Sequence, residues 1–219
     1  KWPIDVGLGF WWFDKADGYA VNSKRGRDHD MLQFNVYKLM DPTRAPYVRA
    51  AAIHELFHLL QYNYAPQQAQ AGADGWLYEM CSTWSEWLNG AANYYPDNII
   101  TNEPRFPING LFNATGTLAV NDSQAGSAAN HGYVSSLFLR FLIRYTDNNP
   151  QRVGLLWTSI RAGSDIPRAF DHAWGEDWPR IWELFCQSLY GGDLRSWQET
   201  HLSATNVARK VKAERPQNF

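Results

Sequence analysis

The stretch AAIHELFHLLQYNY, residues 51–64, carries two histidines, His54 and His58, four positions apart, with Glu55 directly after the first. Apolar residues recur at helical spacing through this stretch and just before it, and Pro46 suits a first helical turn. The recurring positions are Val48, Ala51, Ala52, Leu56, Leu59 and Leu60. The pattern therefore predicts a helix over residues 46–62.

The spacing of the two histidines is typical of a zinc site. Positions four apart share one face of a helix, so His54 and His58 can present ring nitrogens to one ion. Glu55 lies on a neighbouring flank, where it can reach a water on that ion without being a ligand. The alternative is that both histidines are partly buried polar residues of an amphipathic helix. A zinc ion with three protein ligands and an open position would support hydrolysis near neutral pH.

A third ligand is needed, and two continuations can be compared. A metzincin would have a glycine at position 61 and a histidine at position 64, but the chain has Gln61 and Tyr64. Glu79 follows His58 by 21 residues on the next predicted helix, WLYEMCSTWSEWLNG. A short connector would let the two helices form an antiparallel pair, so the predicted ligands are His54, His58 and Glu79.

Two further residues on this second helix have two interpretations each. Glu86 lies seven positions after Glu79, nearly on the same face, and could hydrogen-bond a ligating histidine or be a plain surface charge. Thr83, one turn after Glu79, could hydrogen-bond a ligating imidazole or only pack. The sequence alone leaves both pairs of alternatives open.

The motif HELFH, residues 54–58, followed by WLYEMCSTWSEW resembles the gluzincin metallopeptidases, in which the third ligand is a glutamate on the following helix. Within that group the chain is similar to bacterial, usually exported, metalloproteases. The segments that carry this likeness are HELFHLLQ, WLYEMCSTWSE and HGYVSSLFLRFL. The resemblance implies Zn²⁺ at His54, His58 and Glu79, Glu55 as general base and acid, and a secreted or extracytoplasmic protein.

Gluzincins also use a downstream tyrosine or histidine to stabilise the oxyanion of the tetrahedral intermediate. The segment NHGY opens the next strongly helical stretch, so Tyr133 and His131 are the candidates for this role. The alternative for Tyr133 is that it only packs. The predicted enzyme is a zinc metallopeptidase, most simply an endopeptidase, because no motif for holding a free peptide terminus is present.

The predicted fold is α+β, in a single zincin-like catalytic domain over residues 1–219. Short aromatic or alternating runs, IDVGLGFWWF, GYAVN and MLQFNVYKL, predict a small, mostly antiparallel sheet over about residues 1–40, packed on the active-site helix. The active-site helices span about 46–90. A long loop, about 94–130, and a mainly helical part, about 131–200, follow.

Composition limits the partners. Twenty basic residues against 22 acidic ones leave a net charge of −2, which argues against nucleic acid or an anionic membrane as a partner. The expected partner is a peptide or protein substrate, bound by a monomer without a membrane segment. Cys81 and Cys186 allow at most one disulfide. The competing functional hypothesis is a zinc-stabilised, non-catalytic domain that binds peptide or glycan, with the many aromatic residues as its recognition surface.

Overall fold

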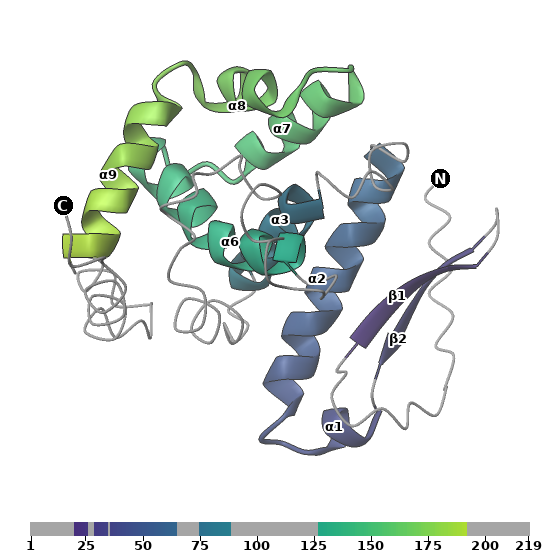
Figure 1. Cartoon of the computed structure of the whole chain (residues 1–219). Helices are drawn as coiled ribbons and strands as arrows, with labels where there is room; N and C mark the ends of the chain where they lie inside the picture. The colour runs from purple at the N-terminus through teal and green to yellow at the C-terminus, as the bar shows by residue number, and fades with distance from the viewer. Residues whose placement is uncertain (1–19, 26–28, 35, 65–74, 89–126, 192–219) are drawn as a thin grey trace.

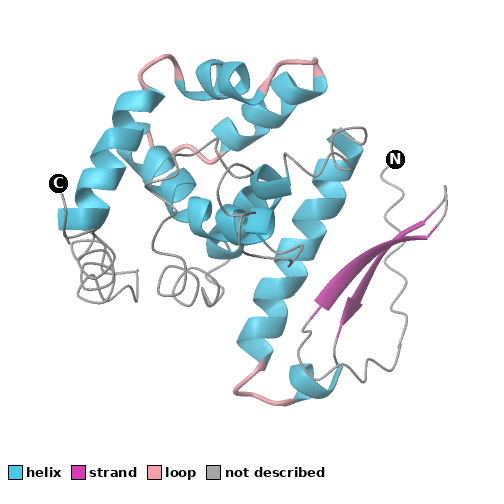
Figure 2. Cartoon of the chain, viewed as in Figure 1, coloured by secondary structure: helices cyan, strands magenta, loops and turns pink. Residues whose placement is uncertain are grey.

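Helices make up most of the structure, a computed structural model that describes residues 20–25, 29–34, 36–64, 75–88 and 127–191 (Figure 2). The elements are β1 (Ala20–Arg25), β2 (His29–Phe34), α1 (Val36–Met40), α2 (Ala45–Tyr64), α3 (Gly75–Leu88), α6 (Ser127–Thr146), α7 (Gln151–Arg161), α8 (Ile166–Trp174) and α9 (Trp178–Gly191). Helix α2 lies between the β1–β2 hairpin and the helices α3 and α6 (Figure 1).

The core is centred on α3 and α6, the pair of described elements with the most extensive contact. Both helices bury large apolar side chains, and α7, α8 and α9 each add more. The fully buried members are Trp76, Leu77 and Met80 of α3, Phe138, Leu139 and Leu142 of α6, Leu156 of α7, Phe170 of α8 and Phe185 of α9. A helix that is apolar on most of its circumference must be enclosed by others, so the polar residues of α3 are carried into the interior with it.

Helices α3 and α6 lie in close contact at Gly132. A Cβ atom at this position would lie 2.5 Å from the Cβ of Glu79 and closer still to the carbonyl oxygen of Trp76. Ordinary carbon contacts lie at about 3.5–4.0 Å, so no side chain fits between the two backbones here. The glycine therefore sets the distance between α6 and the turn of α3 that carries Glu79.

The predicted α+β class is wrong, because the described part of the chain is all-α in class and its strands amount to one hairpin. β1 and β2 pair antiparallel, with Ala20 opposite Phe34 and Arg25 opposite His29. The run MLQFNVYKL, predicted as a strand, leaves β2 after Phe34 and becomes helix α1. A two-stranded ribbon cannot form a layer of the core, whereas a sheet of three or more strands could. The run IDVGLGFWWF lies outside the described residues.

The predicted helices are confirmed with small shifts of their ends. The helix predicted over residues 46–62 is α2, which extends over Ala45–Tyr64. Helix α6, which contains the segment NHGY, begins at Ser127, inside the predicted loop 94–130. The rest of that loop lies outside the described residues. At α8 the N-cap is Asp165, whose carboxylate accepts a hydrogen bond from the backbone N–H of Arg168.

Both cysteines are free thiols. Cys81 is fully buried on α3, and burial raises the pKa of its thiol to about 12, against a weaker opposing effect of Trp157. Burial and the nearby Glu183 raise the pKa of Cys186 to about 11. Neither thiol is therefore a nucleophile near neutral pH, because the reactive form is the thiolate.

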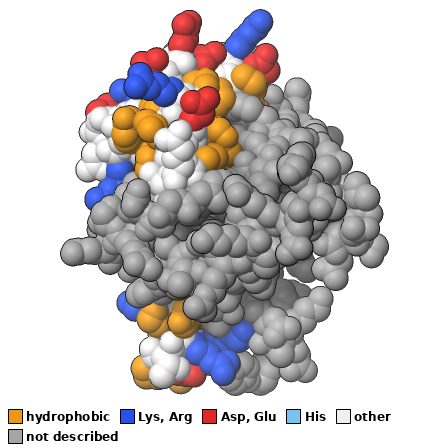
Figure 3. Space-filling view, turned by 60° about the vertical axis from the view of Figure 1, so that its left-hand side comes forward, with side chains coloured by type: hydrophobic (Ala, Val, Ile, Leu, Met, Phe, Trp, Pro, Cys, Tyr) orange, Lys and Arg blue, Asp and Glu red, His pale blue; other side chains and the backbone are white. Residues whose placement is uncertain are grey.

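The described helices include none with the length and apolar character needed to cross a membrane. In the space-filling view, the coloured upper part of the face shows acidic, basic and hydrophobic side chains intermixed (Figure 3). Charges of both signs alternate on that part of the surface, so it presents no field of a single sign.

Candidate metal site

Three side chains from α2 and α3 meet at one point. The Nε2 atoms of His54 and His58 lie 3.1 Å apart, and Oε2 of Glu79 lies 3.0 Å from the first and 3.4 Å from the second. Ligand atoms held at about 2.0–2.2 Å from a tetrahedral ion are about 3.3–3.6 Å apart. The observed separations are at or just below that range, and the two nitrogens and one carboxylate oxygen are a donor set that zinc accepts.

Glu86 fixes the orientation of the His54 ring. Nδ1 of His54 lies 3.0 Å from Oε1 of Glu86, whose side chain is completely buried. A carboxylate can only accept, so Nδ1 carries the proton and donates it. Nε2 is then the nitrogen that faces Glu79 and His58. Of the two interpretations of Glu86, the buried hydrogen-bond partner is the one that the structure shows, and a surface charge is excluded.

Gln61 fixes the orientation of His58 in the same way. The amide nitrogen of Gln61 donates to the carbonyl oxygen of Tyr78 at 3.0 Å, which turns Oε1 of Gln61 toward Nδ1 of His58 at 2.8 Å. Nδ1 of His58 is therefore the donor. The hydroxyl of Ser82 lies 3.0 Å from the same Nδ1 and donates to Oε1 of Gln61 at 3.2 Å. Gln61 is 1% exposed, so water does not compete for these bonds.

These contacts give the site a preference for a positive charge. With both Nδ1 atoms protonated, the neutral rings present two lone pairs to the carboxylate of Glu79, and three acceptors within 3.4 Å repel one another. Either a proton on one ring or a metal ion between the three atoms removes this repulsion. Histidine ligands are typically held by a partner on the other ring nitrogen, as here for both rings.

The pKa values of the site have the same cause. Burial lowers the pKa of His54, but the hydrogen bonds and charges of Glu79 and Glu86 outweigh it and raise the pKa to about 10. Burial raises the pKa of Glu79, and the two histidines outweigh it and lower the pKa to about 2. Glu79 is therefore the anion of the cluster. Burial, together with the charges of Glu79 and Glu55, raises the pKa of Glu86 despite its contact with His54.

Glu55, the predicted general base, lies between the two histidines on α2 and is partly exposed, unlike Glu86. Its charge contributes to the raised pKa values of Glu86 and Tyr62, so its carboxylate is within electrostatic reach of both. A partly exposed carboxylate on the rim of a buried cluster is accessible to water, as a general base must be.

The two candidates for an oxyanion donor have different surroundings. Tyr133 is half-buried on α6, and the centre of its ring lies 6.0 Å from the centre of the His54 ring. His131 is completely buried, with its ring edge against Trp76 at 5.6 Å between centres. Only Tyr133 is therefore both beside a predicted ligand and partly exposed.

Tyr62 is a neighbour of the site that sequence reasoning missed. Its ring lies nearly parallel to the His58 ring, with centres 6.1 Å apart. Burial, followed by the charges of Glu79 and Glu55, raises the pKa of its hydroxyl, which keeps that hydroxyl protonated and able to donate. Tyr62 follows His58 by one helical turn, and this spacing is the signal that could have identified it.

Thr83 does not have the role considered for it. Its hydroxyl is buried and has no hydrogen-bond partner within the described part of the chain, whereas the adjacent Ser82 contacts His58. In the sequence, Gln61 stands out only as a residue that breaks the metzincin pattern. Its position three residues after His58, on nearly the same helix face, was the available signal for a hydrogen-bonding role.

Comparisons with models of known protein families, with curated proteins and with solved structures gave no match to this chain.

Proposed function

We propose that this protein is a zinc-dependent peptidase whose metal ligands are His54, His58 and Glu79. The observation that carries the proposal is the convergence of two Nε2 atoms and one carboxylate oxygen within 3.0–3.4 Å, with each Nδ1 tied to a buried acceptor. The donor set and its separations suit zinc. The arrangement also leaves one side of the cluster, at the 21% exposed Glu79 side chain, open to solvent.

A bound zinc ion would supply Lewis-acid chemistry, because it acidifies water and polarises a carbonyl group. The chain supplies the proton transfers. Glu55, beside the ligands and partly exposed, takes a proton from the attacking water and returns it to the leaving amine. Glu86 and Gln61 accept the Nδ1 protons of the two rings, so Nε2 is the nitrogen that each ring would turn toward the ion.

Hydroxyl donors complete the site. The phenols of Tyr133 and Tyr62 flank the two histidines from α6 and α2, and either could donate to the oxygen that gains negative charge in the transition state. His131 is less suited, because its completely buried ring packs against Trp76.

Peptide bonds are the proposed substrate, because the motif HELFH followed by the Glu79 helix resembles gluzincin peptidases. The same resemblance supports export from the cytoplasm. The metal chemistry would serve other amides equally well, so the substrate class depends on this likeness and not on the geometry of the cluster.

The test is metal analysis of the purified protein combined with cleavage profiling on a peptide library. We expect one zinc per chain and cleavage within peptides by the wild type. Glu55→Gln should keep the zinc and lose cleavage, whereas His58→Ala should lose both. Undiminished cleavage by Glu55→Gln would contradict the role of Glu55. Stoichiometric zinc without cleavage of any library member would favour the non-catalytic binding domain instead.

A further inference from the structure

A cavity of about 340 Å³ lies between α2, α3 and α7 and adjoins the metal cluster. Gln61, whose Oε1 accepts the Nδ1 proton of His58, is one of the residues that line it. Leu88 and Tyr64, both exposed, also line the cavity and give it access to solvent. The volume lies in the range of about 300–1,000 Å³ that small-molecule sites occupy. It is also well above the roughly 150 Å³ of an engineered apolar cavity that binds benzene.

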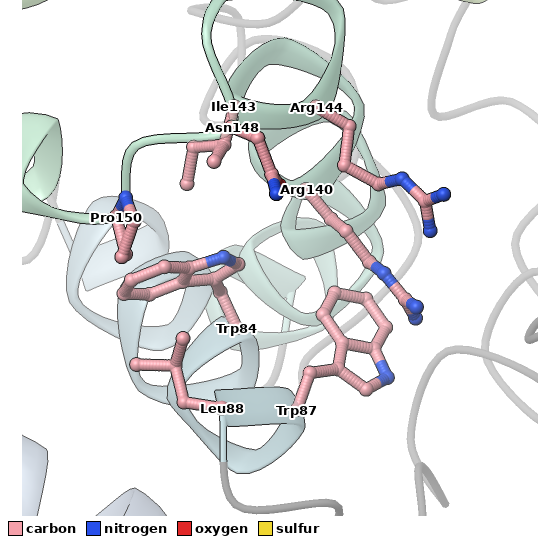
Figure 4. Close-up of a pocket in the computed structure, with 8 residues that line it drawn as sticks. All are labelled: Trp84, Trp87, Leu88, Arg140, Ile143, Arg144, Asn148 and Pro150. Atoms are coloured by element: carbon pink, nitrogen blue, oxygen red, sulfur yellow. The ribbon is translucent and has the colours of Figure 1, made fainter.

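A larger cavity of about 670 Å³ shares the walls formed by Trp84, Leu88 and Pro150. In Figure 4 these three residues lie on one side of the larger cavity, and the guanidinium groups of Arg140 and Arg144 lie on the opposite side. The smaller cavity differs in charge, because none of the described residues that line it is acidic or basic. A buried charge without a partner is unfavourable, so the smaller cavity favours a neutral occupant.

The walls of the smaller cavity are mainly aromatic and aliphatic. The rings of Phe57 and Trp84 meet edge to face, with their centres 6.4 Å apart. Trp157, Leu60 and Val153 add further apolar surface. Aromatic side chains interact favourably with another ring that packs on their edges or faces, so an aromatic occupant suits these walls.

Gln61 gives this apolar cavity one specific polar feature. A primary amide has two N–H donors, and one of those of Gln61 is bonded to the carbonyl oxygen of Tyr78 at 3.0 Å. The other N–H has no acceptor among the described residues, although Gln61 is only 1% exposed. A buried donor without an acceptor is destabilising, and an occupant that presents a carbonyl oxygen to it would remove this cost.

We propose that the smaller cavity binds a small neutral aromatic molecule with one carbonyl group, and that its occupancy is coupled to zinc binding through Gln61. The coupling rests on the proposed function, because it requires zinc at the cluster. The binding of the aromatic molecule does not, because the metal-free protein contains the whole cavity.

The coupling follows from the planarity of the amide group. The direction of Oε1 and the directions of both N–H bonds are fixed together, so an acceptor on the second N–H holds Oε1 of Gln61 toward Nδ1 of His58. This orientation is the one that leaves Nε2 of His58 facing Glu79. The occupant should therefore raise the affinity for zinc, and zinc should raise the affinity for the occupant by the same factor.

The probes are acetophenone and α-methylstyrene, which have nearly the same shape but carry a carbonyl oxygen and a methylene group, respectively. Each is titrated into the metal-free full chain, and binding is followed by the NMR signals of the Trp84 and Trp157 indole N–H groups. We expect one molecule of either probe per chain. Gln61→Leu should weaken acetophenone about fivefold relative to α-methylstyrene, because it removes the donor and keeps the size of the side chain. If neither probe bound, or if the ratio of the two affinities were the same in both proteins, the site would be refuted.

Gly154 locates the probes in the cavity. It is a lining residue, and a Cβ atom added there would meet nothing within 4 Å, so a larger side chain is accommodated without a clash. Gly154→Leu should weaken both probes at least tenfold, whereas Gly154→Ala should leave their binding nearly unchanged. Undiminished binding of both probes by Gly154→Leu would place them elsewhere and overturn the assignment.

The coupling is measured as the zinc affinity in a chelator competition, with and without saturating acetophenone. We expect acetophenone to raise the zinc affinity of the wild type about fivefold or more and to leave that of Gln61→Leu unchanged. An equal or lower zinc affinity of the wild type in the presence of acetophenone would refute the coupling. A wild type that bound acetophenone but no zinc would contradict the proposed function and the coupling, and would leave the cavity assignment supported.

Discussion

Gly132→Ala is the perturbation whose effect follows most directly from the packing of α3 on α6. The new Cβ would lie 2.5 Å from the Cβ of Glu79 and closer to the carbonyl oxygen of Trp76. Because one of the obstructing atoms belongs to the backbone, no rotamer change relieves the clash, and the helices must separate by about 1 Å to restore normal contact. Overpacking of this kind costs about 1–3 kcal/mol, and the backbone contact favours the upper end.

Alanine is also the better helix former, by about 1 kcal/mol, so the net loss of stability should be about 2 kcal/mol. For a chain of this size that loss lowers the melting temperature by about 4–8 °C. Because α3 must shift at Glu79, zinc affinity should fall as well. The assays are urea unfolding followed by circular dichroism and zinc titration against a competing chelator.

The matched control is Gly154→Ala on α7, where the added methyl meets nothing within 4 Å. It receives the same gain in helix propensity without a clash, so it should stabilise the protein by about 0.5–1 kcal/mol and leave zinc affinity unchanged. If Gly132→Ala were as stable as Gly154→Ala and bound zinc like the wild type, the close approach of α3 and α6 at Glu79 would be refuted.

Four further predictions concern the cluster itself. Gln61→Leu, which keeps the size of the side chain but removes the acceptor of the His58 Nδ1 proton, should weaken zinc about 10–100-fold in a chelator competition, and an unchanged affinity would exclude the orienting role. The pKa of His54 is raised from 6.5 to about 10, so the metal-free protein keeps the His54 proton between pH 6.5 and about pH 10. Because zinc must displace this proton, calorimetry at pH 7.5 in buffers of different ionisation enthalpy should show about one proton released per zinc. Because this pKa is raised in the folded protein, charged His54 stabilises the metal-free fold fully below about pH 6.5 and progressively less as the pH rises toward 10. A free energy of unfolding of the metal-free protein that increased over this pH interval would contradict the raised pKa of His54. Tyr133→Phe and Tyr62→Phe each remove one hydroxyl group. The variant that lacks the oxyanion donor should lose about 10²–10³ in kcat with little change in zinc content. If both variants were as active as the wild type, neither phenol would be the oxyanion donor.

The helices and the three converging side chains could be predicted because the relevant information is local. The relation of His54 to His58 follows from helical geometry alone, and Glu79 needed only a short connector between two helices. The partners of the Nδ1 atoms depend on how α2 crosses α3, which no spacing in the sequence gives. This is why Ser82 was missed and Thr83 was considered in its place.

The fold class could not be predicted for a different reason. Alternation in the segment around residues 20–34 does produce two strands, but a sheet also depends on how many other segments pair with them, which is a non-local property. The polar and apolar pattern of MLQFNVYKL fits a strand, yet the chain forms α1 at Val36–Met40. The role of Gly132 was hidden likewise, because an isolated glycine in a helical pattern does not indicate which backbone it faces.

We propose that Nε2 of His54, Nε2 of His58 and a carboxylate oxygen of Glu79 bind one zinc ion. The most direct test of this proposal is a crystal structure of the zinc-loaded protein with anomalous diffraction measured at the zinc absorption edge. We expect one strong peak about 2.0–2.2 Å from all three atoms, with both Nδ1 atoms still on Glu86 and Gln61. A peak bound through Nδ1, or the absence of a peak at the cluster in protein that holds zinc elsewhere, would contradict it.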